Sequence, residues 1–175
     1  MATVLPIIRW PHDRLRTASK PVPFEQSREM LPVFVADLAA TLATKQSGVA
    51  LSAIQVGWDV QLFVVEKHAA GVEGDGVLVF INPIVRERSA EQETKQEGCL
   101  SLPDIFVPVT RSKTVTLSAL DIEGKEFTVE AGGFFARVLQ HEMDHLAGTT
   151  IADHVGTVQR HIMRQKLKHL RETGH

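Results

Sequence analysis

The sequence has very little cysteine and no long apolar run. One thiol among 175 residues cannot form an internal disulfide, which excludes the disulfide frameworks of small secreted domains. No apolar stretch approaches the roughly 20 residues that a transmembrane helix requires, and the amino-terminal residues lack the layout of a signal peptide. We therefore expect a cytoplasmic protein, with neither a membrane nor DNA as its partner.

The length and the hydrophobic patterning favour one α+β domain over residues 1–175. Apolar residues at helical spacing predict a helix over residues 31–45. Short runs of branched and aromatic residues predict strands over residues 61–66, 76–81, 114–120 and 126–130. The pair Asn82-Pro83 is expected to end the second of these strands. Gly148 is expected to end the helix that contains residues 141–145.

The pentapeptide HEMDH at residues 141–145 is the most informative part of the chain. On a helix it sets His141 and His145 at i and i+4 on one face, with the Glu142 carboxylate beside them. Both histidines continue an apolar stripe that begins with Phe134 and Val138, so we expect this face to point into a core. Such a set binds a divalent metal and supplies a general base. The alternative is an amphipathic helix with two surface histidines.

A catalytic metal site also needs a third protein ligand. The zinc-protease patterns do not provide one, because Ile151 stands six residues after His145 and the one glutamate downstream, Glu172, lies in a basic tail. Cys99 is the best candidate, because a thiolate with two imidazoles suits a borderline-soft divalent metal. A Cys–His hydrolase is a weaker alternative, and a lone cysteine can also be a small buried hydrophobe.

Three motifs in this order resemble those of the peptide deformylase family. Residues 97–101 read EGCLS, and residues 140–148 read QHEMDHLAG, which fits the family's QHExDHLxG. The first motif, usually GxGLAAxQ, is GVALSAIQ at residues 48–55, with Ala50 and Ser52 in place of a glycine and an alanine. Residues 6–16 are also similar, so the resemblance spans nearly the whole chain.

The resemblance implies a metal-dependent hydrolase that removes the formyl group from the N-terminal formylmethionine of newly made proteins and releases formate. It implies an α+β fold with antiparallel or mixed sheets around a central HExxH helix, followed by a C-terminal helix. The implied metal ligands are Cys99, His141 and His145, with Fe(II) in the cell and zinc, nickel or cobalt as substitutes. Apart from the resemblance, the polar candidates for orienting the imidazoles are Glu97, Arg111 and Asp144, and ordinary surface charge is the more common explanation for each of them.

The catalytic roles also follow from the resemblance. Glu142 would accept a proton from the attacking water and deliver it to the departing amine. The side-chain amide of Gln55 and the backbone N–H of Leu100 would stabilise the oxyanion, together with the metal. Without the resemblance, Gln55 would be taken for a surface polar residue and Leu100 for a core residue.

The nascent peptide would bind in extended form between two backbone segments, near Val49 and Ala50 on one side and Gly98 on the other. Its methionine side chain would enter an apolar pocket that includes Val49 and Val138. The Ala50 methyl is expected to crowd the substrate where the family usually has a glycine. A catalytically weak or differently selective deformylase is therefore one alternative, and a metallopeptidase is a less favoured one.

The chain from Thr157 onward is predicted to be a basic helix. Its expected apolar side consists of Val158, Ile162 and Leu170. Its basic residues are Arg160, Arg164, Lys166, Lys168 and Arg171. Such a stretch is usually a solvated helix, and the sharper hypothesis is that it contacts ribosomal RNA by charge.

Overall fold

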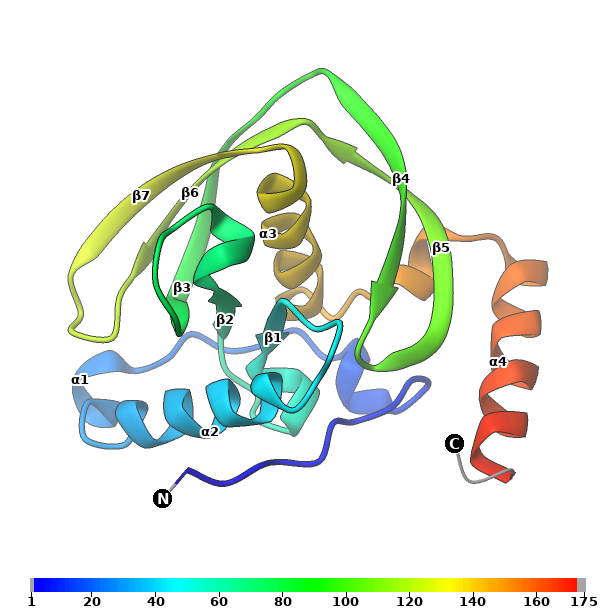
Figure 1. Cartoon of the computed structure of the whole chain (residues 1–175), viewed down its shortest axis with the longest axis horizontal. Helices are drawn as coiled ribbons and strands as arrows, with labels where there is room; N and C mark the ends of the chain where they lie inside the picture. Colours follow the sequence, from blue (N-terminus) through cyan, green and yellow to red (C-terminus); the bar gives the residue numbers. More distant parts are fainter. Residues whose placement is uncertain (1, 173–175) are drawn as a thin grey trace.

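Helix α3 (Gly133–Leu146) lies between a five-stranded antiparallel sheet and a two-stranded hairpin (Figure 1). The computed structural model describes residues 2–172, with side chains described up to residue 169. The strand order is β1-β2-β3-β6-β7 in the large sheet, and β4 pairs with β5 in the hairpin. This arrangement confirms the predicted α+β fold with antiparallel sheets and a C-terminal helix, since every pairing between named strands is antiparallel. Helix α3 contains the HEMDH residues.

The strands are β1 (Ala50–Ser52), β2 (Leu62–Glu66), β3 (Val77–Arg88), β4 (Gln92–Cys99), β5 (Leu102–Ser112), β6 (Thr114–Leu120) and β7 (Glu126–Gly132). The other α-helices are α1 (Phe24–Ser27), α2 (Leu31–Ala43) and α4 (Thr157–Glu172). Short 3-10 helices are η1 (Asp13–Arg16), η2 (Ala53–Val56), η3 (Lys67–Ala70) and η4 (Ile151–His154). The helix and the four strands predicted outside the motifs are all present, although β3 and β7 extend further than expected.

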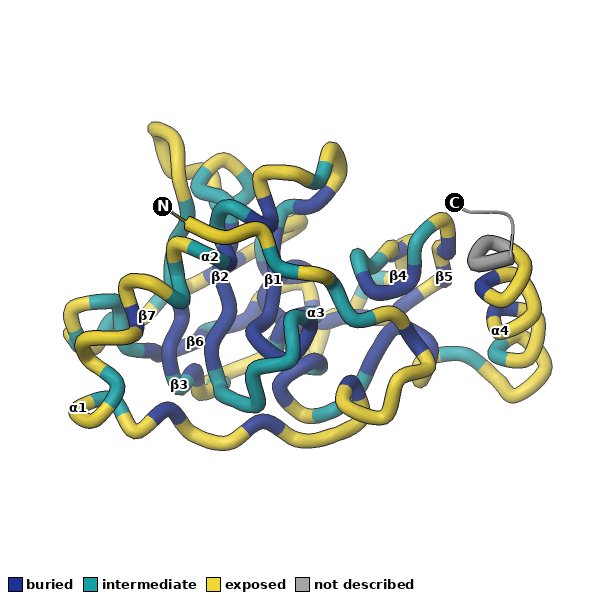
Figure 2. Tube along the Cα trace, turned by 90° about the horizontal axis from the view of Figure 1, so that it is seen from below, coloured by how far each residue is buried: buried dark blue, intermediate teal, exposed yellow. Residues whose placement is uncertain are grey.

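Strand β2 is buried on both faces, as its dark colour in Figure 2 shows. Leu62 and Val64 pack in the cluster that contains the buried residues of α2. Phe63 and Val65 point the other way and pack in the cluster that contains the buried residues of α3. Successive side chains of a strand point to opposite faces of the sheet. Both faces of β2 are covered, one by α2 and the other by α3, so residues 62–65 of this strand must all be apolar.

Strand β3 continues through Asn82 and Pro83, so the strand end predicted at this pair is wrong. Asn82 has a φ of 50°, and the register with β6 shifts between Ile81 and Ile84. The Asn82 side chain accepts a hydrogen bond from the Val22 N–H at 2.7 Å and donates one to the Val22 carbonyl at 2.9 Å. The pair therefore marks a bulge held by the amino-terminal segment, and the strand resumes beyond it.

The β4-β5 hairpin is absent from the elements predicted from the sequence. Strand β4 begins with exposed polar residues, and β5 contains Pro103 and Pro108, which are unusual within a strand. The β5 side chains nevertheless alternate, with Ile105, Val107 and Val109 buried and their neighbours more exposed. Prolines are tolerated here because a two-stranded sheet leaves β5 with a free edge.

The buried face of α3 includes Val138 and His145, which are 6% and 1% exposed. Phe134 is 59% exposed, so its predicted place in the core stripe is wrong. Gly133, the residue before it, is exposed as well, which shows that the first turn of α3 lies beyond the side chains that cover the rest of the helix. Gly148 follows the helix end as predicted, with a φ of +74° and no room for a Cβ, which would lie 2.7 Å from the Arg16 carbonyl oxygen.

Helix α4 packs on β5 through Met163 and Leu167, which are 3% and 4% exposed. The predicted apolar side is wrong: Val158 and Ile162 are 76% and 51% exposed, and the side chain of Leu170 lies outside the described residues. Two buried residues one turn apart are enough to dock the helix against the existing core of β5, η1 and η4. Among the residues described, no helix has the length and apolar character needed to cross a membrane.

We expect Met163→Ala to lower the free energy of unfolding by about 2–4 kcal/mol, because it leaves a cavity between α4 and β5. The matched control is Ile162→Ala, which removes an exposed side chain of the same helix and should change stability by less than about 0.5 kcal/mol. Urea denaturation of both variants measures the difference. Equal stability of the two variants would contradict the docking of α4 through Met163.

Candidate metal centre and active site

Cys99, His141 and His145 converge at one point between β4 and α3. Each offers one ligand atom, and the three atoms lie within 4.8 Å of one another. The Cys99 Sγ is 3.2 Å from Nε2 of His145. One sulfur and two ring nitrogens at this separation fit a tetrahedral divalent ion that keeps a fourth position open.

Two local features bring these donors together. The helical repeat of α3 places His141 and His145 one turn apart, with ring centroids 5.0 Å apart. Cys99 is the last residue of β4, where the hairpin register shifts between Gly98 and Cys99 before the chain turns into β5. The shift aims the Cys99 side chain at the helix instead of along the regular strand alternation.

Electrostatics favour the ligand form of the cysteine. Burial by itself raises the pKa of the Cys99 thiol, but the charge of His145 and the hydrogen bonds from His141 and His145 outweigh burial. The pKa of Cys99 therefore lies well below its usual value. A thiolate is the form in which cysteine binds a metal.

The Glu97 carboxylate orients His141 from behind. It is 6% exposed and lies 3.0 Å from Nδ1 of His141, which leaves Nε2 of that ring as the ligand atom. Arg111 donates two hydrogen bonds to it at 2.9 Å, and Arg137 donates a third at 2.7 Å. Burial alone raises the pKa of Glu97, but the hydrogen bonds and charges of Arg111 and His141 bring it far below the usual range. Glu97 is therefore an ionised carboxylate with partners on β5 and α3.

Asp144 lies behind Arg111, one contact further than Glu97 from the candidate ligand His141. Its Oδ2 accepts hydrogen bonds from Nη1 of Arg111 at 2.6 Å and from Nε2 of His154 at 2.8 Å. Asp144 therefore supports Arg111 and the ring of His154. Of the polar candidates, only Glu97 lies within hydrogen-bond distance of His141 or His145 among the described residues. Nδ1 of His145 is buried and has no hydrogen-bond partner among the described residues, so no polar group orients that ring from behind as Glu97 orients His141.

Glu142 lies beside the two histidines on α3 and is 3% exposed. Burial raises its pKa, while the charges of His141 and His145 and a hydrogen bond from Ser52 oppose that rise. A raised carboxyl pKa brings the group closer to neutral pH, which suits a residue that must both accept and release a proton.

Gln55 lies on η2 and is 2% exposed, so it is not the surface residue that composition alone would suggest. Its Oε1 accepts a hydrogen bond from the Ser52 N–H at 2.9 Å. Its Nε2 then points toward Ser101 Oγ at 3.1 Å and Cys99 Sγ at 3.6 Å. The amide donor therefore faces Cys99, one of the three candidate ligands. Leu100 follows Cys99 in the turn between β4 and β5, where its N–H is outside the strand ladder.

A family model described as polypeptide deformylase matches residues 4–161. The chain belongs to the peptide deformylase family. The activity of this family is removal of the formyl group from the N-terminus of a protein, and the divalent metal of the family fits the donors present here.

Individual relatives agree with the deformylase assignment. The chain is 37% identical to a peptide deformylase of Brucella suis, with 96% of this chain and 94% of the relative covered. It is 37% identical to one of Acinetobacter baumannii, over 94% of this chain and 90% of the relative. A crystal structure of a peptide deformylase from Legionella pneumophila superposes with a TM-score of 0.86 at 31% identity, covering 98% of both chains.

The apolar residues predicted to bind substrate lie in one cluster. Ala50 and Val138 belong to its buried part, and Val49 packs against it. Ala50 is 8% exposed and shares this cluster with Phe63. On the other side, a Cβ at Gly98 would lie 2.8 Å from the exposed ring of Phe106, so the glycine makes room for that ring.

The sequence missed two residues of this deformylase centre. Arg137 is 7% exposed and, besides Glu97, donates to the carbonyl groups of Val109 and Glu93. Ser52 donates to Glu142. The only signal for Ser52 was its place in the first motif, where alanine is usual. Arg137 had no signal, because an arginine within a helix is most often a surface residue.

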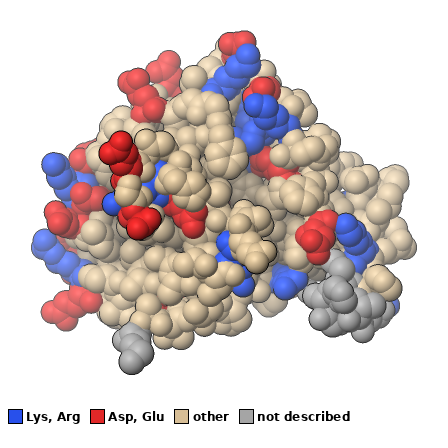
Figure 3. Space-filling model, in the orientation of Figure 1, with Lys and Arg blue, Asp and Glu red and all other residues tan. Residues whose placement is uncertain are grey.

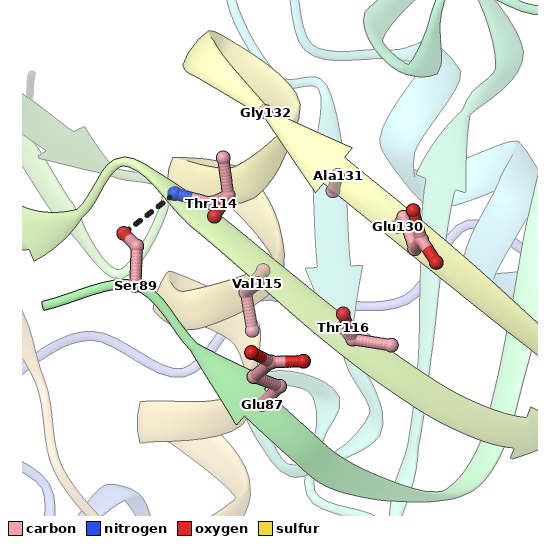
Figure 4. A pocket seen from close by; sticks show the side chains of 8 residues that line it. All are labelled: Glu87, Ser89, Thr114, Val115, Thr116, Glu130, Ala131 and Gly132. Atoms are coloured by element: carbon pink, nitrogen blue, oxygen red, sulfur yellow. Dashed lines mark hydrogen bonds between the residues drawn. The ribbon is translucent and has the colours of Figure 1, made fainter. Parts of the chain in front are cut away.

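A depression of about 440 Å³ on the large sheet is separate from the metal centre (Figure 4). It is lined by residues of β3, β6 and β7 and of the turns beside them: Glu87, Ser89, Thr114, Val115, Thr116, Glu130, Ala131 and Gly132. It contains none of the predicted site residues. The chemistry expected of a deformylase therefore does not involve this depression.

We expect Glu97→Gln to lower the free energy of unfolding by about 3–5 kcal/mol, because it leaves the buried guanidinium group of Arg137 without its countercharge and leaves Arg111 with Asp144 alone. The matched control is Glu91→Gln, which removes one exposed partner of Lys113 and should cost at most about 1 kcal/mol. Thermal and urea unfolding of both variants measure the difference. A Glu97→Gln variant as stable as the control would contradict a structural role for this carboxylate.

Proposed function

We propose that this chain removes the formyl group from the N-terminal formylmethionine of nascent peptides and releases formate, with Fe(II) as its metal. The observation that supports this most strongly is the position of Glu142, a buried carboxylate next to two histidines that share a ligand cluster with Cys99. Burying a carboxylate is costly, so a carboxylate buried in this position is best explained as a proton acceptor in catalysis.

Cys99, His141 and His145 would hold the metal. A divalent metal bound there would lower the pKa of a water molecule and polarise a carbonyl group. Iron is our choice because of the family resemblance, although the donor set also suits zinc. A location in the cytoplasm fits both an easily oxidised ion and a substrate made on ribosomes.

Glu142 accepts the proton of the water that attacks the formyl carbon and delivers it to the nitrogen of the departing peptide. Negative charge develops on the formyl oxygen as the carbon becomes tetrahedral. The Nε2 of Gln55 and the N–H of Leu100 donate hydrogen bonds to that oxygen. Both donors are held in advance, Gln55 by the Ser52 N–H and Leu100 by the β4-β5 turn, so little reorganisation is needed.

The formylmethionyl peptide binds in extended form between the backbone near Val49 and Ala50 and the backbone near Gly98. Its methionine side chain enters the apolar cluster that Val49 and Val138 share. A peptide deformylase from Acinetobacter baumannii, 29% identical with a TM-score of 0.80, has been crystallised with Met-Ala-Ser bound. That tripeptide begins with the methionine that deformylation would leave, which supports the same substrate class here.

Neither alternative function is favoured. The family assignment supports an active deformylase over a weak paralogue. A metallopeptidase would need a third ligand typical of a protease, whereas Cys99 takes that position in the cluster.

Contact of α4 with the ribosome stays a prediction. Several basic side chains of α4 already have partners in the fold: Arg160 donates to the carbonyls of Ala152 and Val155, and Lys166 to that of Asp104. On the face shown in Figure 3, side chains of both signs are interspersed instead of forming one basic patch. Any contact with ribosomal RNA therefore depends on the charge left on the outer side of this helix.

The deformylase activity is tested by formate release from formyl-Met-Ala-Ser, with ferrous iron supplied under anaerobic conditions. We expect turnover by the parent, abolition by a chelator, and recovery when iron is restored. Glu142→Gln should lower kcat by about 10²–10⁴-fold, because it removes the proton acceptor and keeps its shape. Metal content of the variant serves as the control and should equal that of the parent. Absence of formate from the iron-loaded parent would refute the function.

Ribosome contact is tested by co-sedimentation at low and high salt. We expect the parent to pellet with ribosomes at low salt and the Arg164→Gln/Lys168→Gln double variant to pellet less, because each lost charge weakens an electrostatic contact. This double variant keeps Met163 and Leu167 but loses the contact of Arg164 with the Trp10 ring, so urea unfolding must first show that it is as stable as the parent. Equal pelleting of the two proteins would count against the contact.

A further inference from the structure

Ser52 connects the two catalytic groups that come from different parts of the chain. It is the last residue of β1 and the residue that caps η2, and it is fully buried. Its Oγ lies 2.5 Å from Oε2 of Glu142, across a sequence separation of 90 residues. This distance is typical of a hydroxyl that donates to an ionised carboxylate.

The direction of this hydrogen bond follows from the two groups themselves. An ionised carboxylate can only accept, and the Ser52 hydroxyl has one proton to donate, so Ser52 donates to Glu142. The Ser52 backbone is also engaged, because the Gln55 side chain accepts from the Ser52 N–H at 2.9 Å in the capping box of η2.

The Glu142 carboxylate has few other restraints. Among the residues described, Ser52 is the one side chain that donates a hydrogen bond to it. The terminal torsion of a glutamate carboxylate is broad, and only some of its settings would aim a carboxylate oxygen at a water near Cys99, His141 and His145, so the Ser52 hydrogen bond restricts that torsion. A fixed Oε2 leaves Oε1 as the oxygen that exchanges the proton.

We propose that Ser52 is a positioning residue, whose hydroxyl holds the Glu142 carboxylate in the orientation needed for proton transfer while its backbone N–H holds the Gln55 amide. The backbone contact would survive any substitution, but the hydroxyl contact depends on this side chain. Alanine, the usual residue of the family at this position, offers no such donor. This chain therefore relies on a contact that most of its family does without. The inference depends on the proposed roles of Glu142 and Gln55 in deformylation.

The test compares Ser52→Ala with Ser118→Ala in the iron-loaded enzyme, using formyl-Met-Ala-Ser. Ser118 is a matched control, because it is also a buried serine with a side-chain partner, Arg86, and it lies on β6 away from the ligand cluster. We expect Ser52→Ala to lower kcat about tenfold with KM changed less than twofold, because substrate binding is intact and only proton transfer suffers. Ser118→Ala should keep the parent kcat, and Ser52→Thr, which keeps the hydroxyl, should recover most of it.

A double-mutant cycle with Glu142→Gln separates positioning from a general effect on folding. If Ser52 acts through Glu142, Ser52→Ala should change the residual kcat of the Glu142→Gln enzyme by less than twofold. A tenfold loss that persists in the Glu142→Gln background would overturn the proposal, as would a Ser52→Ala enzyme with the parent's kcat or a higher one. An inactive parent would instead refute the deformylase function, so the two failures are distinguishable.

Discussion

The ionised carboxylate of Glu97, buried between β4, β5 and α3, is the interaction on which the rest of the site depends. Arg111 from β5 and Arg137 from α3 both donate to it, and it contacts the ring of His141. Burying a charge is costly unless every partner is present, so this group is satisfied only when hairpin and helix are correctly placed. The same placement sets Cys99, two residues further along β4, next to the histidines.

The large sheet also positions the β1-η2 segment against helix α3. Strand β2 is buried on both faces, and β1 pairs with it from Ala50 to Ser52. The chain then turns into η2, where the capping box holds Gln55 against Ser52. Three separate segments therefore supply the centre: β4 carries the thiolate, α3 carries the imidazoles and Glu142, and η2 carries the amide donor.

The errors in the sequence prediction share one physical cause. Phe134 and Ile162 were assigned to buried faces by helical periodicity, which identifies a face but not whether another element covers it. The residue type of Asn82 favours turns and so predicts a strand end, whereas in the structure its side chain is held by the Val22 backbone and the strand continues. The β4-β5 hairpin was missed because its polar strand and its prolines have no strong local preference for a strand. In each case contacts between distant residues decided the outcome.

The sequence by itself determined the relation of His141, Glu142 and His145, because positions within one helix follow from its repeat alone. It also determined the chemistry of the donors, since a thiolate and two imidazoles select the same kind of metal wherever they meet. Only the tertiary structure decided that Cys99 meets a histidine 46 residues away. It likewise decided that Glu97 lies behind one imidazole and that Ser52 reaches Glu142. Residues far apart along the chain have no local geometry in common, so only the packing of sheet, hairpin and helix could bring them into contact.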